Sequence, residues 1–360
     1  MFSSELWNKP AGGGGSNFYD YQIAKSIRWD SGYLKRTPSS AGNRQTWTFS
    51  CWVKKAIQPG DTDVMLLNAG TSGNQSSRFR AYWYGDNLRS SSADANYNVS
   101  SGVYRDPSAW QHIVWKLTGG TSTQYVNGTS VSTSSVSGDV AINNNVEHTL
   151  GIAGGYETGG RFKGYLAEVV FIDGTALDPT SFASEKNGVW IPDDVSELTF
   201  GSQGYHLDFA NASAPGNDVS GNNNDWTNVS LATHDQMLDS PTFNSDSNGG
   251  NFNTLNSIDL QTSDTSLADG MLTLSTTAGQ RSAFGTMGVS SGKWYYESRQ
   301  VNDTSSNGYP LGIQRISTGL QWKNWTHYIG SAVSTYDYSY AMYNKGTGDT
   351  SEKVYNDTWT

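Results

Sequence analysis

Few residues in this chain of 360 have the types and spacing that catalysis requires. The G-x-S-x-G string at residues 288–292 matches a hydrolase nucleophile turn, but such a turn precedes a helix, whereas the residues that follow, KWYYES, alternate like a strand. The five histidines are scattered without metal-ligand spacing, and His112 and His148 are expected to be ordinary strand residues. The single cysteine, Cys51, is expected to be a buried apolar residue rather than a reactive thiol. No catalytic residue is expected, and the protein is predicted not to be an enzyme.

A calcium site is the one metal site that the residue types suggest. Asp218, Asn222 and Asp225 cluster in the stretch GNDVSGNNND, and their side-chain oxygens suit a hard cation. Their spacing is not that of an EF-hand, and turns rich in Asn and Asp also arise for their backbone geometry alone. Both interpretations stay open, and no cofactor other than this calcium is expected.

Carbohydrate binding requires aromatic platforms beside polar groups on loops. Tyr82, Tyr84 and Asp86 lie together at a turn, and Trp52 is a fourth residue of this kind. These four are the expected ligand-binding residues. The alternative is that the aromatic side chains belong to the core or to an edge strand, where aromatic residues are common.

The strand expected to organise the chain covers residues 44–55, RQTWTFSCWVKK. It alternates with period two, so Trp47, Phe49, Cys51 and Val53 share one face, and Thr48, Ser50, Trp52 and Lys54 share the other. The first face must be covered by a second sheet. Trp52 marks the second face as a surface contacted by a ligand or a neighbouring subunit.

Further strands are expected along the first half of the chain. Residues 164–174, GYLAEVVFIDG, are apolar on both faces and predict a central strand that pairs with residues 44–55. Residues 110–117, WQHIVWKL, alternate, and Asn127-Gly128 predicts a hairpin shortly after them. Strands separated by turn residues in this way are typical of an all-β sandwich.

Two further local structures are predicted. Residues 26–29 and 33–36 are expected to pair as a hairpin around Asp30-Ser31-Gly32. A short helix is expected to begin at Asp178-Pro179 and to end at Asn187-Gly188.

Composition and charge exclude some classes of partner. The chain has 40 Gly, 20 Tyr and 13 Trp but only 16% charged residues, which is typical of extracellular all-β modules. A net charge of −10 argues against nucleic acid, which requires a basic surface. The N-terminus lacks the basic flank and the apolar run of a signal peptide or membrane span, so neither export nor membrane insertion is expected.

The chain divides into four expected parts. Residues 1–22 form an aromatic peptide with a glycine-rich joint, 23–195 a β-domain, 196–265 a connector with a strand that pairs back onto that domain, and 266–360 a second sandwich. The peptide is expected to dock onto another protein, and the alternative is that it packs on its own domain. Its docking residues are Phe2, Leu6, Trp7, Phe18, Tyr19 and Tyr21.

The first β-domain resembles the laminin-G-like, concanavalin-like jelly roll. The resemblance is carried by TWTFSCWVKK, by WQHIVWKL followed by QYVNG, and by GYLAEVVFIDG. Glycosidases of that fold share a Glu-x-Asp-x-x-Glu strand. Here Glu168 is followed by Val169 and Val170, and Asp173 falls at the strand end, so Glu168 is expected to be solvent-facing or paired.

The second half resembles the opening of a SPRY domain. GKWYYE at residues 292–297 and LGI at residues 311–313 carry this resemblance, whereas the later strands of that family are absent. The resemblance implies an incomplete, SPRY-like second sandwich. Either the sequence stops partway through a longer protein, which is the favoured explanation, or another subunit completes the sandwich.

The order of these parts resembles tail fibre or virion appendage proteins of phages that infect aquatic bacteria. The resemblance implies a non-enzymatic virion protein, made in the host cytoplasm, that docks to the particle by its N-terminus and displays its sandwiches for host-surface recognition. Its implied partners are other virion proteins and a glycan of the host cell envelope, and its implied assembly is a homo-oligomer, as a trimer. The alternative is a capsid or tail decoration with a spacer or contact role, and a secreted lectin or glycosidase is less favoured.

Overall fold

The chain folds into two compact units, one of residues 1–55 and 60–252 and one of residues 56–59 and 253–360. The computed structural model describes residues 18–56, 62–70, 78–92, 95–153, 160–243, 249–258, 260, 264–277, 283–291, 294–299, 309–314, 339–344 and 352–355. Antiparallel sheets dominate both units, so the predicted all-β class is confirmed. No helix among the described residues is long and apolar enough to cross a membrane.

The first sheet is organised around the predicted strand β3 (Trp47–Lys55), which pairs with β8 on one side and β12 on the other. Every residue of β3 is buried, which requires cover on both faces of the sheet. The strand order of this first sheet is β10 (Thr129–Ser135), β9 (Thr121–Val126), β8 (Trp110–Thr118), β3, β12 (Gly164–Asp173), β1 (Ser26–Trp29) and β17 (Gln236–Met237). The strand β15 (Tyr205–Leu207) also pairs with β12. The predicted pairing of β3 with β12 is confirmed.

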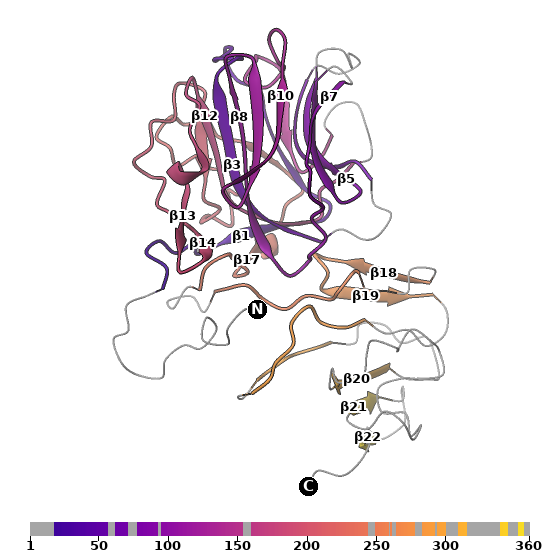
Figure 1. Cartoon of the computed structure of the whole chain (residues 1–360). Coiled ribbons are helices and arrows are strands. Elements are labelled where there is room, and N and C mark those ends of the chain that lie inside the picture. The colour runs from indigo at the N-terminus through magenta and orange to yellow at the C-terminus, as the bar shows by residue number, and fades with distance from the viewer. Residues whose placement is uncertain are drawn as a thin grey trace. The chain divides into compact units, whose positions relative to one another are not determined.

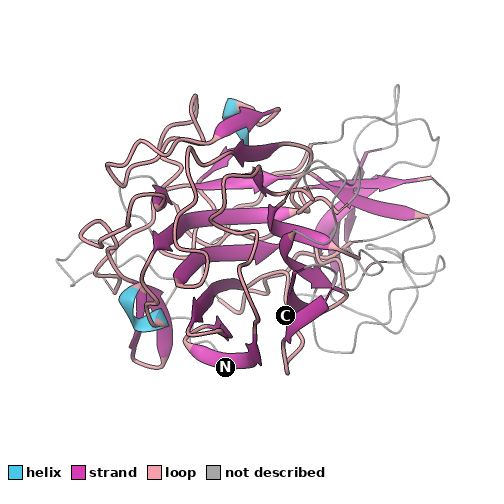
Figure 2. Cartoon of the chain, turned by 90° about the horizontal axis from the view of Figure 1, so that it is seen from above, coloured by secondary structure: helices cyan, strands magenta, loops and turns pink. Residues whose placement is uncertain are grey.

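The second sheet covers the inner face of the first, as Figures 1 and 2 show from two directions. Its order is β16 (Thr227–Val229), β2 (Tyr33–Arg36), β11 (His148–Leu150), β4 (Val64–Ala69), β5 (Phe79–Tyr84), β6 (Asn87–Ser92) and β7 (Ala95–Val99). Aromatic rings fill the space between the sheets. Trp47 of β3 meets Phe79 of β5 edge-on, with 5.7 Å between ring centroids, and such contacts add to the hydrophobic stabilisation.

The predicted hairpin of residues 26–29 and 33–36 is wrong. Ile27 of β1 pairs with Leu166 of β12, whereas Leu34 of β2 pairs with Leu150 of β11, so the two strands belong to opposite sheets. Ser26 and Ile27, which point to opposite faces, are both buried, so β1 needs cover on both faces and lies inside the first sheet. The turn at Asp30 therefore carries the chain across the sandwich.

The predicted short helix is also wrong beyond its first turn. Pro179–Ser181 forms one turn of 3₁₀ helix, and β13 (Ala183–Lys186) and β14 (Val189–Pro192) follow as a hairpin. Asn187 and Gly188 join these strands with φ of 53° and 79°, the left-handed values that Asn-Gly adopts in two-residue hairpin turns. The hairpin predicted at Asn127-Gly128 is confirmed, with φ of 46° and 76° between β9 and β10.

Residues 196–252, expected to be a connector, belong to the first unit. They supply three strands to its two sheets, namely β15 and β17 to the first and β16 to the second. A single 3₁₀ turn, η4 (Thr233–Asp235), precedes β17.

The second unit contains a hairpin of β18 (Thr265–Ala268) and β19 (Thr273–Thr276) and a three-stranded sheet of β20 (Tyr309–Gln314), β21 (Ser339–Asn344) and β22 (Glu352–Tyr355). Residues 294–299 form no strand, which corrects the strand expected in KWYYES. Trp294, Tyr295 and Tyr296 are exposed there, because no neighbouring strand among the described residues covers them.

Candidate functional site

The outer face of β3 is filled by the chain itself, which corrects the expectation of a contact surface at Trp52. The Trp52 side chain is only 4% exposed and stacks on the His112 imidazole, with 5.0 Å between ring centroids. Trp190 of the β13–β14 hairpin stacks on His112 as well, and Ile23 and Tyr21 of the N-terminal segment pack into the same apolar cluster. Trp52 is therefore a core residue and is not available to a ligand.

His112 and Ser50 form a buried hydrogen bond, in which the tautomer of the His112 ring is the wrong one for nucleophilic catalysis. Trp190 Nε1 donates to His112 Nδ1 at 3.0 Å, so the ring proton lies on Nε2. That nitrogen donates to Ser50 Oγ at 2.8 Å, whereas a catalytic histidine must accept the serine proton. Burial lowers the pKa of His112 to about 3, so the ring is neutral at pH 7.

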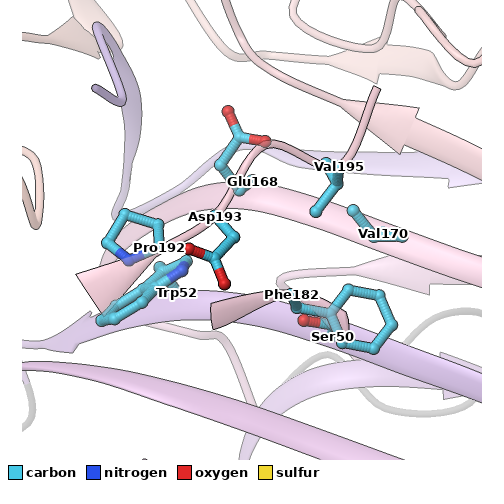
Figure 3. Close-up of a pocket in the computed structure, with 8 residues that line it drawn as sticks. All are labelled: Ser50, Trp52, Glu168, Val170, Phe182, Pro192, Asp193 and Val195. Carbon is cyan, nitrogen blue, oxygen red and sulfur yellow. The ribbon is translucent and has the colours of Figure 1, made fainter. Parts of the chain in front are cut away.

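The cavity beside this contact has a volume of about 10 Å³, which is room for about one water molecule. Figure 3 shows the side chains that line it, among them the carboxylates of Glu168 and Asp193. A glycosidase also uses two carboxylates, but a sugar ring must fit between them. This space is too small for a sugar, so the two carboxylates have a structural role.

Glu168 is paired, one of the two environments that the sequence predicted for it. It lies at an irregularity of β12, where the register against β3 shifts between Ala167 and Val170 and Glu168 has a φ of 46°. Such a bulge re-aims a side chain. The Glu168 carboxylate lies 2.6 Å from His206 Nε2 and accepts a hydrogen bond of 3.1 Å from the Tyr21 hydroxyl.

The charge of Glu168 controls the titration of His206. Burial lowers the pKa of His206, but the hydrogen bond and the charge of Glu168 outweigh it and raise the pKa above 6.5. The pair is buried, with 6% of the His206 side chain and 8% of the Glu168 side chain exposed.

We expect this pair to stabilise the protein more at pH 6 than at pH 9. A raised histidine pKa contributes stability that is complete below the unfolded value of 6.5 and is lost as the pH rises through the folded value. Glu168→Gln should lower the free energy of unfolding by roughly 1.5–3 kcal/mol at pH 6 and should flatten its decline toward pH 9. Urea unfolding across this range measures both effects. The control Glu185→Gln removes an exposed carboxylate and should keep the wild-type slope; an unchanged slope in Glu168→Gln would contradict the assignment.

The described part of the N-terminal segment packs on its own unit, which is the alternative that the sequence left open for it. The Lys186 ammonium lies 5.8 Å from the Phe18 ring centroid and forms an ion pair of 2.8 Å with Asp20. Tyr19 contacts Phe18 edge-on, with 5.0 Å between centroids. The other docking residues, Phe2, Leu6 and Trp7, lie outside the described residues.

The loop of Asp218, Asn222 and Asp225 is held by its own hydrogen bonds. The Asp218 carboxylate accepts from His206 N, from Ser220 N and Oγ, and from Asn224 N, at 2.8–2.9 Å. Asn222 Nδ2 donates to the Gly201 and Gly204 carbonyls, and Asp225 Oδ1 accepts from Asp218 N. No group of three or more His, Cys, Asp or Glu in the described chain has an arrangement that could hold a metal. The geometry favours the turn interpretation.

Two of the expected ligand-binding residues meet at the turn between β5 and β6. Tyr84 is 45% exposed, and Gly85, with a φ of 58°, turns the chain so that Asp86 follows beside it. Asp86 Oδ2 accepts a hydrogen bond of 2.6 Å from Arg105 Nε. Tyr82 is only 3% exposed and packs against Met65 and Ala153, so it is excluded from this surface.

Two arginines that sequence reasoning missed lie beside this turn. The Arg89 guanidinium lies 4.5 Å from the centroid of the Tyr84 ring. Because Tyr82 pairs with Arg89, the hairpin register puts Arg89 diagonal to Tyr84 on one face, which the sequence could have indicated. Arg105 comes from the loop before β8, and no local signal links it to Asp86. An aromatic ring beside a carboxylate and two guanidiniums can stack on the apolar face of a sugar and bond its hydroxyls.

Residues 30–181 match the family described as the concanavalin A-like lectin/glucanases superfamily, in its laminin G form. This part of the chain is thus a domain of that superfamily. No curated protein matches the chain.

Solved structures show partial similarity. A native heptameric SAP-like pentraxin from Limulus polyphemus is 18% identical over 44% of this chain and 79% of its own, with a TM-score of 0.35. Domain 4 of an extracellular arabinanase from Geobacillus stearothermophilus is 20% identical over 46% of this chain and 79% of its own, with a TM-score of 0.36. Laminin alpha1 domains LG4-5 of mouse are 11% identical over 44% of each chain, with a TM-score of 0.33.

Proposed function

We propose that this chain, with its concanavalin A-like domain at residues 30–181, is a non-enzymatic virion structural protein, a tail fibre or appendage, that recognises a glycan of the host cell envelope. The order of its parts, the polar and aromatic composition and the acidic charge support this proposal. The N-terminal residues Phe2, Leu6 and Trp7 would attach it to the particle. A homo-oligomer, as a trimer, is the proposed assembly at the virion surface.

The exposed turn of Tyr84, Asp86 and Arg105, here named the tyrosine turn, carries the glycan proposal. It is held in place before any ligand binds, because Tyr104 N donates to Asp86 O at 2.9 Å and Asn87 Nδ2 donates to the Ser100 and Gly102 carbonyls at 3.2 Å. A fixed site loses less conformational entropy on binding than a flexible loop does. The opposite charges of Asp86 and Arg105 leave both donors and acceptors for sugar hydroxyls.

We expect Tyr84→Ala to weaken binding of host envelope polysaccharide about tenfold, because the variant loses the stacking surface. Biolayer interferometry with immobilised polysaccharide measures this effect. The matched control is Tyr295→Ala, which removes a tyrosine that is 85% exposed in the second unit and should bind like the wild type. Equal affinity of Tyr84→Ala and wild type would reject the tyrosine turn, and release of sugar from the polysaccharide would reject the non-enzymatic role.

A second candidate is a capsid or tail decoration that contacts neighbouring subunits. The adjacent exposed rings of Trp294, Tyr295 and Tyr296 favour it, since clustered exposed apolar side chains are typical of interaction surfaces. A blank glycan array, together with unchanged adsorption of particles that lack the first unit, would favour this role over glycan recognition.

A further inference from the structure

Near the end of β3, a lysine amine faces both an asparagine amide and a carboxylate inside the first unit. Lys54 Nζ lies 2.8 Å from Asn251 Oδ1 and 2.8 Å from Asp239 Oδ2. Because a C=O bond is about 1.2 Å long, the Asn251 amide carbon lies within about 4 Å of the amine. Attack on such a carbon begins from a separation of roughly 3–3.5 Å, so a small side-chain rotation is enough to bring the two atoms together.

Hydrogen bonds fix the orientation of both groups that face the amine. Asn251 Nδ2 donates to the Ser108 carbonyl at 2.7 Å, which turns the amide oxygen toward Lys54. Trp110 Nε1 donates to Asp239 Oδ1 at 2.8 Å, which leaves Oδ2 for the amine. The three side chains are therefore held in one arrangement by the folded chain.

The surroundings of the amine exclude water and disfavour its charge. Lys54 is 0% exposed and Asp239 2%, and the centroid of the Tyr165 ring lies 5.6 Å from the Lys54 ammonium. Burial lowers the pKa of Lys54 and raises that of Asp239, and both shifts favour transfer of a proton from the ammonium to the carboxylate. The neutral amine that results is a nucleophile. Asn251 is only half-buried, so ammonia displaced from its amide can reach solvent.

We propose that Lys54 and Asn251 become joined by an intramolecular isopeptide bond, which the folded chain forms by itself with Asp239 as the proton carrier. Asp239 takes a proton from the Lys54 ammonium, and the free amine attacks the amide carbon of Asn251. A new C–N bond forms, Asp239 passes its proton to the amide nitrogen, and the old C–N bond breaks. The amide nitrogen leaves as ammonium after taking a second proton from the attacking nitrogen, and Asp239 is again a carboxylate.

This bond gives the first unit a covalent cross-link that cysteine cannot supply. The chain has a single cysteine, so it forms no disulfide within itself. A bond between residues 54 and 251 closes a loop through most of the first unit and attaches residues 239–252 to β3. A cross-link that closes a long loop restricts the unfolded chain and so stabilises the folded one. The bond adds to the stability that the Lys54–Asp239 ion pair contributes in the chain before reaction.

Intact mass spectrometry of the purified full chain tests this proposal. The wild type should be lighter than its sequence by one ammonia, and a peptide map should contain Lys54 and Asn251 in one branched peptide. Asn251→Ala should have the full mass of its sequence and should unfold at a lower urea concentration. The matched control Asn217→Ala, at an exposed asparagine, should keep the loss of ammonia. Asp239→Asn keeps the shape of the carboxylate and should have its full mass.

A wild type of full mass would overturn the proposal. Loss of ammonia that persists in Asn251→Ala would also overturn it, because a succinimide at an Asn-Gly turn such as Asn187-Gly188 releases ammonia too. Loss of one water, with a branch between Lys54 and Asp239, would reject Asn251 as the partner. A folded Asp239→Asn variant that keeps the loss of ammonia would reject Asp239 as the proton carrier. If that variant does not fold, the wild-type mass and Asn251→Ala still decide whether the bond exists.

Discussion

Asp239→Ala is expected to lower the free energy of unfolding of the first unit by roughly 3–5 kcal/mol, the cost of breaking a buried ion pair. Asp239 and Lys54 are 2% and 0% exposed, and their charged atoms lie 2.8 Å apart. Trp110 Nε1 donates to the other Asp239 oxygen at 2.8 Å. Removal of the carboxylate leaves the Lys54 ammonium in the interior without its counter-charge and the Trp110 indole without its acceptor.

The remaining contacts of Lys54 explain why this pair matters for the fold. Its ammonium also donates to Asn251 Oδ1 at 2.8 Å and to the Phe252 carbonyl at 2.6 Å, so it attaches residues 239–252 to the end of β3. Burial lowers the pKa of Lys54 and raises that of Asp239, which means that each charge depends on the other. Loss of the pair should therefore loosen the whole segment.

Urea unfolding, followed by tryptophan fluorescence, measures this effect. The matched control is Glu147→Ala, which breaks a surface pair with Lys35 of 3.6 Å and should cost less than about 1 kcal/mol. The double variant Lys54→Met/Asp239→Leu should recover part of the lost stability, because no charge is then buried, whereas the Trp110 indole still lacks its acceptor. A cost for Asp239→Ala no larger than that for Glu147→Ala would show that the pair has no such role.

The sequence predicted the strands of the sandwich whose own residues alternate or are apolar on both faces. β3 alternates over nine residues, and β12 is apolar on both faces, so their burial and pairing follow from local composition. The partner of β1 was not predictable in this way. Asp30-Ser31-Gly32 suits either a hairpin or a crossing between sheets, and only the distant residues of β12 and β11 decide between them.

The candidate sites were predicted less well because distant segments decide their exposure. Trp52 lies on the outward face of a strand, and it is buried by Trp190 and Ile23, which are far away in sequence. Tyr84 and Asp86 remain at the surface because the tight turn at Gly85 keeps them beyond the strand ends.

Acid is expected to destabilise the protein through His112. Its pKa of about 3 in the folded protein lies below the unfolded value of 6.5. Between these two pH values the unfolded chain therefore binds a proton at His112 that the folded chain does not bind. Stability is therefore complete above pH 6.5 and falls as the pH drops toward 3. At pH 5 the loss from this residue is roughly 2 kcal/mol, at 1.36 kcal/mol for each pH unit. The rings of Trp52, Trp190 and Phe182 around it carry no charge that could compensate.

A variant that cannot titrate isolates this contribution. His148 is also buried with a pKa lowered to about 4, so the wild type should lose stability from both residues as the pH falls. His112→Gln keeps a donor and an acceptor, and its stability deficit relative to wild type should shrink by roughly 2 kcal/mol between pH 7 and pH 5. His234→Gln, at a side chain that is 76% exposed, should show no such change. Urea unfolding at each pH measures the difference, and a deficit that stays constant would mean that His112 is protonated in the folded protein, against its burial and its hydrogen bond from Trp190.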